Sequence, residues 1–193
     1  MKIEENSVLI VIDVQGGDMT GTWSENLQAA MEADRKMVEN AKRVLDVFRA
    51  KKIPVVQLKE VHRKDMVDFG RELDGTEGVH LLEDSPHTDY AHLTYPIEGE
   101  YQITKRRYSG FFGTDLEILL KGLGAKTLYL IGGFTDVCVH YTAVDAHQHD
   151  YHFRVVADAC AGSSVEAHEY ALKAMQYLQR DALLTVADIE AAI

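Results

Sequence analysis

The feature that most constrains the fold is a series of short apolar runs, each followed by an amphipathic stretch. Residues 8–12 are all Val, Leu or Ile, which is typical of a strand buried on both faces of a parallel sheet. Residues 26–50 then carry apolar side chains at helical spacing,. The same alternation predicts strands at 53–58, 101–104, 126–131, 153–156 and 182–186, and helices at 114–121, 136–149 and from Ser163 or Ser164 to Leu178. This order predicts an α/β fold with a mostly parallel sheet covered on both faces.

The segment 60–100 interrupts this pattern. It is rich in Gly, Pro, Asp, His and charge and has no clean period. A stretch this long without regular structure is usually a lid or a binding loop. The chain of 193 residues contains no internal repeat or linker. We therefore expect one domain, 1–193, with a functional loop inserted after its second strand.

Composition excludes several classes of function. The formal charge of −11 argues against a nucleic-acid partner,, and we interpret Arg106 and Arg107 as a basic pair on a solvated face. Residues 1–7 do not resemble a signal peptide, and no apolar run is long enough to span a membrane,. Two cysteines do not make a disulfide framework, so we expect a cytoplasmic protein without a membrane partner,.

Cys138 stands at a junction that favours reactivity. It follows the apolar run 128–131 and two glycines, at the start of the next helical segment. Unpaired N–H groups and the positive end of the helix dipole stabilise a thiolate at such a place. A buried structural cysteine is the alternative, and this is how we interpret Cys160.

Two other polar residues follow predicted strands, Asp13 after 8–12 and Lys105 after 101–104. In a parallel sheet these positions and Cys138 converge on one edge. A lysine can stabilise a thiolate, and a carboxylate can carry the proton that acyl transfer requires. Taken singly, Asp13 could be a turn aspartate and Lys105 a surface lysine, but the three together indicate a catalytic group.

At this point the chain resembles the isochorismatase-like cysteine hydrolases, a family that includes nicotinamidases, N-carbamoylsarcosine amidohydrolase and the biuret and ureidoacrylate hydrolases. Four motifs carry the resemblance: Val-Ile-Asp-Val-Gln (11–15), Ile-Thr-Lys-Arg-Arg-Tyr-Ser-Gly-Phe-Phe-Gly-Thr-Asp-Leu (103–116), Gly-Gly-Phe-Thr-Asp-Val-Cys-Val (132–139) and Val-Val-Ala-Asp-Ala-Cys-Ala-Gly (155–162). Each is modest alone, but their order and spacing are specific.

The resemblance implies a catalytic triad of Asp13, Lys105 and Cys138. It also implies a three-layer α/β/α, Rossmann-like fold with about six parallel strands, and a non-proline cis peptide at Gly133–Phe134. The backbone N–H groups of Phe134 and Cys138 would then form an oxyanion hole. Family members that cleave the vinyl ether of isochorismate lack the cysteine, so its presence implies cleavage of a C–N bond.

The residues after the second predicted strand are relevant to metal binding. Nicotinamidases carry an Asp-x-His element there that, with a further histidine, binds a metal; this chain has Glu60-Val61-His62. His80 or His87 could add a ligand, but zinc needs three or four ligands in fixed geometry, and we expect no metal or other cofactor. The sequence of residues 60–65 resembles that of the ureide-hydrolysing branch of the family more closely. There His62 or Arg63 would orient a polar substrate, unless Arg63 only pairs with nearby acidic residues.

The expected function is a cysteine-dependent amidohydrolase that cleaves a small polar amide, ureide or carbamoyl compound through a thioester and releases ammonia or an amine. The alternatives are a metal-assisted nicotinamidase and a catalytically idle scaffold. Family resemblance further suggests a homo-oligomer. The residues expected to contact substrate are Gln15, Trp23, Glu60, His62, Arg63, Tyr108, Phe111 and Thr135.

Overall fold

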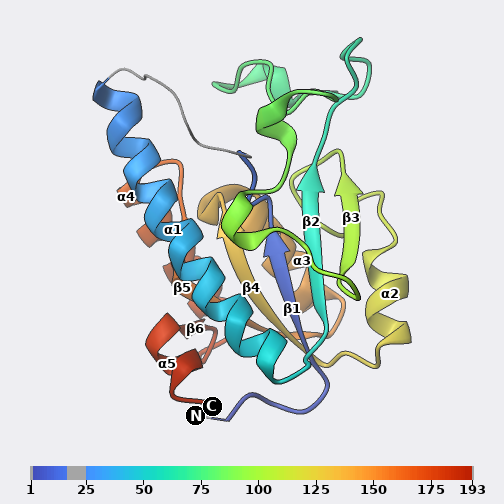
Figure 1. Cartoon of the computed structure of the whole chain (residues 1–193), viewed down its shortest axis with the longest axis vertical. Helices are drawn as coiled ribbons and strands as arrows, with labels where there is room; N and C mark the ends of the chain where they lie inside the picture. Colours follow the sequence, from blue (N-terminus) through green and yellow to red (C-terminus); the bar gives the residue numbers. More distant parts are fainter. Residues whose placement is uncertain (1, 17–24, 193) are drawn as a thin grey trace.

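The computed structural model describes residues 2–16 and 25–192, and its centre is strand β1 (Ser7–Ile12). This strand lies in a six-stranded sheet of order β3-β2-β1-β4-β5-β6, in which every pairing is parallel. The chain starts in the middle, builds outward to one edge, then returns and builds outward to the other (Figure 1). The reversal at β1 and β4 opens a crevice at the carboxyl ends of these strands, where α/β folds place their ligands.

The remaining elements match the predicted alternation. The strands are β2 (Val55–Glu60), β3 (Tyr101–Lys105), β4 (Thr127–Gly133), β5 (His152–Ala161) and β6 (Leu183–Leu184). The helices are α1 (Glu25–Ala50), α2 (Leu116–Gly122), α3 (His140–Gln148), α4 (Val165–Leu178) and α5 (Val186–Glu190). The three-layer, Rossmann-like architecture expected from the sequence is confirmed.

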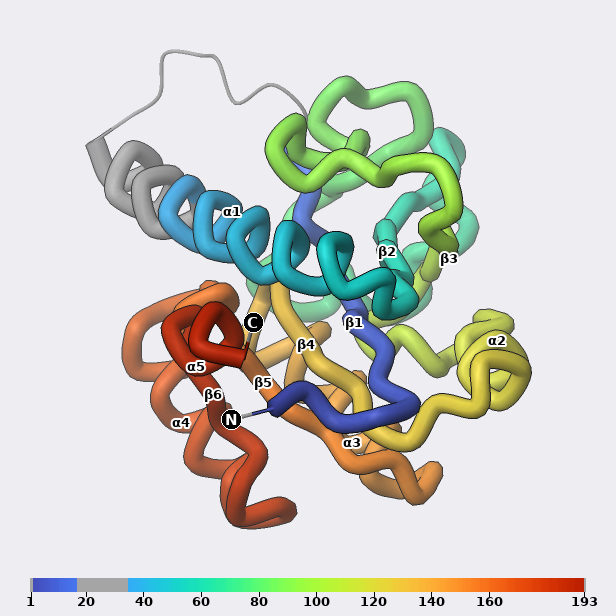
Figure 2. The backbone as a smooth tube through the Cα atoms, turned by 60° about the horizontal axis from the view of Figure 1, so that its bottom comes forward, coloured from blue at the N-terminus to red at the C-terminus, as the bar shows by residue number. Residues whose placement is uncertain are grey.

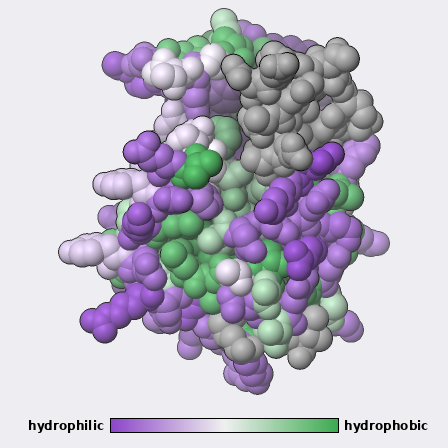
Figure 3. Space-filling view, turned by 90° about the vertical axis from the view of Figure 1, so that its left-hand side faces the viewer, coloured by the Kyte–Doolittle hydropathy of each residue, from purple (hydrophilic) through white to green (hydrophobic). Residues whose placement is uncertain are grey.

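Two hydrophobic layers enclose the sheet. Alternate residues of β1 point to opposite faces, so that Ile10 packs in the layer with α2, α3 and α4, and Leu9 packs in the layer with α1 and α5. Figure 2 shows α1 and α5 near one another beside the strands. Figure 3 shows the left-hand side of Figure 1, where hydrophobic side chains in the middle are bordered by hydrophilic ones. None of the described helices has the length and apolar character that crossing a membrane requires.

Several element boundaries differ from the predicted ones. The helix expected from residue 114 begins at Leu116, because Thr114 is used in the preceding turn, where its hydroxyl donates to the carbonyl of Gly110. Strand β4 continues through both glycines that were expected to end it. A π-helical turn, Thr135–Val139, separates β4 from α3, so Cys138 lies in this turn and not inside a regular helix. The short helix α5 was not predicted.

The segment 61–100 contains no strand and only three short 3-10 turns, Glu72–Asp74, Pro86–Thr88 and His92–Thr94. It follows β2 and folds over the carboxyl ends of the strands (Figure 1). One backbone bridge pairs Tyr90 of this segment with Gln15 after β1, and a second pairs His62 with Leu82 within the segment. The loop expected from the sequence is therefore an ordered cover of the sheet edge.

At Gly132 the backbone of β4 lies too close to that of β1 to leave room for a side chain. The φ of Gly132 is +123°, and a Cβ atom built there would lie 1.9 Å from the carbonyl oxygen of Ile12. Only glycine allows β4 to approach β1 this closely while the chain turns toward Cys138.

We expect Gly132→Ala to destabilise the protein by at least ~3 kcal/mol, because the added methyl group meets backbone atoms that cannot rotate away. Urea denaturation followed by circular dichroism measures the change. The matched control is Gly122→Ala in α2, where a Cβ has no neighbour within 4 Å; its effect should stay within about 1 kcal/mol. Equal effects of the two substitutions would contradict the role of Gly132.

Candidate active site

Three strand ends bring the predicted triad together. Asp13 follows β1, Lys105 is the last residue of β3, and Cys138 lies in the turn after β4. The Lys105 side chain is fully buried and extends past β2, the strand between β3 and β1. Its Nζ lies 2.7 Å from Asp13 Oδ2 and 3.5 Å from Cys138 Sγ. The ammonium thus contacts both the carboxylate and the sulfur.

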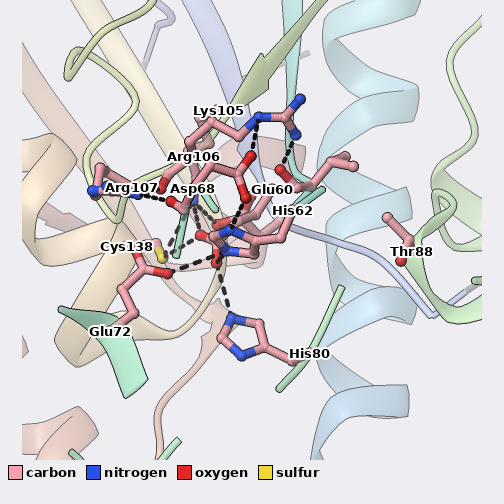
Figure 4. Close-up of polar contacts among 12 residues, drawn as sticks. Glu60, His62, Asp68, Glu72, His80, Thr88, Lys105, Arg106, Arg107 and Cys138 are labelled. Atoms are coloured by element: carbon pink, nitrogen blue, oxygen red, sulfur yellow. Dashed lines mark hydrogen bonds and ion pairs between the residues drawn. The ribbon is translucent and has the colours of Figure 1, made fainter. Parts of the chain in front are cut away.

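A fourth group, Glu60, completes this arrangement (Figure 4). It ends β2, between the strands that carry Asp13 and Lys105, and its Oε2 accepts from Lys105 Nζ. The same oxygen lies 3.8 Å from Cys138 Sγ. The sequence placed Glu60 among the substrate-contacting residues, but here it contacts the ammonium directly. Its position at a strand end is the signal that could have added it to the group.

Burial and charge set the protonation states. Burial raises the pKa of Asp13 to about 6, since Lys105 opposes this effect only in part and the charge of Glu60 adds to it. Burial alone would raise the pKa of Glu60, but hydrogen bonds from His62 and His80, together with Lys105, hold it well below its usual range. Burial lowers the pKa of Lys105, yet its anionic neighbours outweigh that effect and raise it. Lys105 and Glu60 are therefore charged at neutral pH.

The thiol of Cys138 behaves differently from the sequence-based expectation. Burial raises its pKa well above the usual value, Asp13 and Glu60 raise it further, and Lys105 opposes them. The resting form at neutral pH is thus the thiol, and not the stabilised thiolate that the helix start predicted. A nucleophilic Cys138 would therefore have to lose its proton to a neighbouring base.

Behind Glu60 lies a second group of polar side chains. His62 is completely buried and stacks on Phe69, with ring centroids 3.9 Å apart. Its Nε2 lies 3.3 Å from Glu60 Oε1 and 3.2 Å from Glu72 Oε2. His80 Nε2 lies 3.1 Å from Glu60 Oε1, and this hydrogen bond raises the pKa of His80 to about 9. These contacts fix the position of Glu60 against Lys105.

The same residues offer donors for a metal ion. One ligand atom from each of Glu60, His62, Glu72 and His80 lies within 4.8 Å of the others, and neither oxygen of Glu72 has a hydrogen-bond partner among the described residues. Two imidazoles with two carboxylates suit a zinc-like divalent cation. The sequence named Glu60, His62 and His80 as possible ligands, but Glu72 was missed because no motif marks it.

Arg106 and Arg107 are not the solvated pair that the sequence suggested. Arg106 contacts the carbonyl of Val61 and lies 3.1 Å from Asp68 Oδ2, and Arg107 donates to the carbonyl of Asp68. Both arginines therefore fasten the segment after β2 to the end of β3. Arg106 forms an ion pair with Asp68 because the chain folds back there, which composition cannot show.

The turn that contains Cys138 contacts helix α4 through a hydrogen bond. The peptide Gly133–Phe134 is cis, as the resemblance implied. Thr135 is completely buried, and its Oγ1 lies 2.8 Å from Nδ1 of His168 in the first turn of α4. The sequence assigned Thr135 to the substrate, whereas its hydroxyl faces His168, a residue that sequence reasoning did not single out.

A pocket of about 380 Å³ opens above Cys138. Its walls are mostly apolar, with a smaller number of polar groups: the lining residues are Asp13, Gln15, Gly16, Met37, Val38, Glu60, Glu77, His80, Leu81, His87, Tyr108, Gly133, Phe134, Val137, Cys138 and Ala161. Sequence reasoning did not single out Met37, Val38, Glu77 or Leu81 as pocket residues. These come from α1 and from the loop after β2, which no motif marks.

Of the remaining residues expected to contact substrate, some line the pocket and others do not. Tyr108 lines the pocket, and so does Gln15, although its Nε2 donates to the carbonyls of Glu60 and Thr88. Phe111 stacks on His149 away from the lining, and the side chain of Arg63 is exposed with its Nε 4.0 Å from Asp68 Oδ2. Trp23 lies outside the described residues.

Comparison with known proteins shows the family to which the chain belongs. Residues 7–190 match the model of the isochorismatase domain. The chain is 30% identical over 172 residues to ureidoacrylate amidohydrolase RutB from Methylorubrum extorquens, covering 79% of this chain and 68% of that protein. It is 27% identical to the structure of N-carbamoylsarcosine amidase from Thermoplasma acidophilum, with a TM-score of 0.75 and coverage of 96% and 97%. It is also 27% identical to the structure of the pyrazinamidase of Pyrococcus horikoshii in complex with zinc. That match has a TM-score of 0.74 and covers 93% of this chain and 98% of the other.

The fold is a three-layer α/β structure with a candidate site at the carboxyl edge of its parallel sheet. The chain belongs to the isochorismatase family. Relatives in this family include hydrolases of C–N bonds, by their names.

We expect Lys105→Met to destabilise the protein by roughly 3–5 kcal/mol at pH 8, because it leaves two buried carboxylates without their cation. Asp13 already has a folded-state pKa of about 6, above its unfolded value, and removing the cation raises it further,. The penalty is thus small at low pH and grows as pH rises from the unfolded pKa of this carboxyl to its folded pKa. Urea denaturation at pH 5 and pH 8 measures it.

The control is Lys59→Met, which removes a half-exposed lysine 3.6 Å from Asp89 Oδ1. This loss should be below about 1 kcal/mol at both pH values. If Lys105→Met is no more damaging at pH 8 than at pH 5, the two carboxyls are not ionised against Lys105.

Proposed function

We propose that this protein is a cysteine-dependent amidohydrolase that cleaves the C–N bond of a small amide, ureide or carbamoyl compound. The observation that supports it best is the contact of the Lys105 ammonium with both Asp13 and Cys138 at the pocket. The names of the ureidoacrylate and N-carbamoylsarcosine relatives support the same class of bond. Asp13, Lys105 and Cys138 are the proposed catalytic residues.

The reaction follows from the protonation states. Cys138 Sγ attacks the substrate carbonyl while its proton passes to Asp13, a carboxylate above a pH of about 6,. The charge that develops on the carbonyl oxygen is stabilised by the backbone N–H groups of Phe134 and Cys138, the proposed oxyanion hole. Asp13 returns the proton to the leaving nitrogen, and ammonia or an amine departs. Water, deprotonated by Asp13, then hydrolyses the thioester.

Lys105 and Glu60 have supporting roles in this scheme. Lys105 keeps Asp13 ionised and stabilises negative charge as it moves between oxygen and sulfur. Glu60, held by His62 and His80, fixes the ammonium in place. Together they let a buried carboxylate exchange a proton with a buried thiol at neutral pH.

We expect Cys138→Ala to lower ammonia release by at least ~10³-fold, because it removes the nucleophile. The assay uses a panel of nicotinamide, biuret, ureidoacrylate and carbamoyl amino acids. Cys160→Ala is the matched control, since Cys160 is equally buried but lies in β5 and does not line the pocket. Release that survives Cys138→Ala would refute the thiol mechanism. An absence of release from every amide, with a Cys138 no more reactive than Cys160, would favour the idle scaffold.

A second candidate function is a metal-assisted nicotinamidase. The observation that favours it is the cluster of Glu60, His62, Glu72 and His80, which would hold a divalent cation at the pocket wall. Such an ion would polarise the substrate carbonyl as a Lewis acid. Glu60 would then divide its oxygens between the ion and Lys105.

Our proposal requires no metal, so we expect dialysis against EDTA to leave ammonia release unchanged. Metal content measured by mass spectrometry before and after dialysis provides the reference. Glu72→Gln should likewise leave release unchanged to within a fewfold, because Glu72 does not contact Lys105 or Cys138. Loss of activity on dialysis, with recovery on adding Zn²⁺, would establish the second function instead.

The other expectations stay predictions of the same proposal: a small-molecule substrate, a cytoplasmic location and a homo-oligomer. Large apolar or aromatic side chains exposed on α4 are consistent with a subunit contact, namely Val165, Tyr170 and Tyr177.

A further inference from the structure

One carboxylate of the pocket has no role in the reaction above. Glu77, from the loop after β2, lines the pocket, and its Oε2 is buried without a hydrogen-bond partner among the described residues. It acts on its neighbours through its charge: burial and then Glu77 raise the pKa of Tyr108 to about 12. A buried, unpaired carboxylate oxygen is costly unless a ligand donates to it.

The basic side chains around the pocket already have partners within the protein. Lys105 is shared between Asp13 and Glu60. Both ring nitrogens of His80 are engaged, Nδ1 at 2.7 Å from the carbonyl of Gly78 and Nε2 at 3.1 Å from Glu60. His87, the other imidazole of the lining, also has a partner. Arg106 and Arg107 are fastened to the loop, and the exposed Arg63 faces Asp68.

The chain that follows Asp13 adds no cation by its composition until α1 is reached. The sequence of residues 15–34 contains no Lys, Arg or His. Arg35 and Lys36, which come next, are exposed and do not line the pocket. The charged residues within the stretch 15–34 are all acidic: Asp18, Glu25, Glu32 and Asp34. A substrate that carries a carboxylate would therefore find no uncommitted basic side chain among the residues that we can place at the pocket or in this stretch.

We propose that the pocket selects amides that are neutral or positively charged away from the scissile bond, excludes those that carry a carboxylate, and uses Glu77 as the specificity-determining residue. A substrate carboxylate would share the pocket with the carboxylates of Asp13, Glu60 and Glu77, and like charges in one pocket repel,. An N–H donor or ammonium of the substrate would instead be attracted by the negative charge of Glu77. This inference rests on the proposed function and divides its candidate substrates into two charge classes.

Alkylation of Cys138 tests the charge of the pocket without any substrate. Iodoacetamide and iodoacetate transfer nearly equal-sized groups to sulfur with loss of iodide, and they differ in one negative charge. We expect the ratio of their rate constants, iodoacetamide over iodoacetate, to be at least tenfold higher at Cys138 than for free cysteine at the same pH. Peptide mass spectrometry assigns the label, and 0.5 M NaCl screens charges on the outer surface.

Substitutions at Glu77 locate the effect. Glu77→Gln should lower the ratio severalfold, and Glu77→Lys should bring it to or below the value for free cysteine. Glu98→Gln changes the net charge equally at an exposed site outside the lining, and it should leave the ratio unchanged. A wild-type ratio within twofold of free cysteine, or a ratio that Glu77→Lys does not move, would overturn the proposal.

The outcomes separate this inference from the hydrolase reaction. Equal alkylation rates alongside ammonia release that depends on Cys138 would overturn only the charge selectivity. A high ratio that falls in Glu77→Gln, without ammonia release from any amide, would support the selective pocket while refuting the proposed hydrolysis.

Discussion

The structure of the site depends on one buried ammonium group. Lys105 is completely enclosed and is held by Asp13 at 2.7 Å and by Glu60. A charge of this kind is tolerated in the interior only when partners surround it, because burial without them costs many kcal/mol. The strand ends of β1, β2 and β3 must therefore keep their spacing, and the loop after β2 must keep Glu60 in place. The histidines behind Glu60 serve this requirement.

The charge balance around Lys105 explains why the resting sulfur is a thiol. With Asp13 and Glu60 ionised, the ammonium already faces two anions, and a thiolate would add a third in a poorly solvated place. Burial and both carboxylates accordingly raise the pKa of Cys138. Moving the proton from sulfur to Asp13 leaves the total charge unchanged, so the nucleophile can form without importing charge. Asp13, with a pKa of about 6, is suited to this exchange at neutral pH,.

The sequence predicted the parts of the molecule that repeat a simple physical rule. Apolar runs such as 8–12 indicate buried parallel strands, and polar residues directly after such runs meet at one edge, which is how Asp13, Lys105 and Cys138 were found. Boundaries were less predictable where side chains compete with the backbone, as at Thr114, or where a π-helical turn precedes α3. Nothing local distinguishes such a turn from the first turn of an α-helix.

The loop 60–100 lies beyond this kind of prediction for a different reason. Its residues are placed by ion pairs with remote elements, such as Arg106 with Asp68, and not by a period in the chain. Glu72 and Glu77 therefore reach the site without any local signal. The proposed catalytic groups come from strand ends, whereas Glu77 and other residues of the pocket wall come from an irregular loop. The class of bond proposed for cleavage is thus easier to infer from sequence than the substrate that carries it, since the two depend on different kinds of structure.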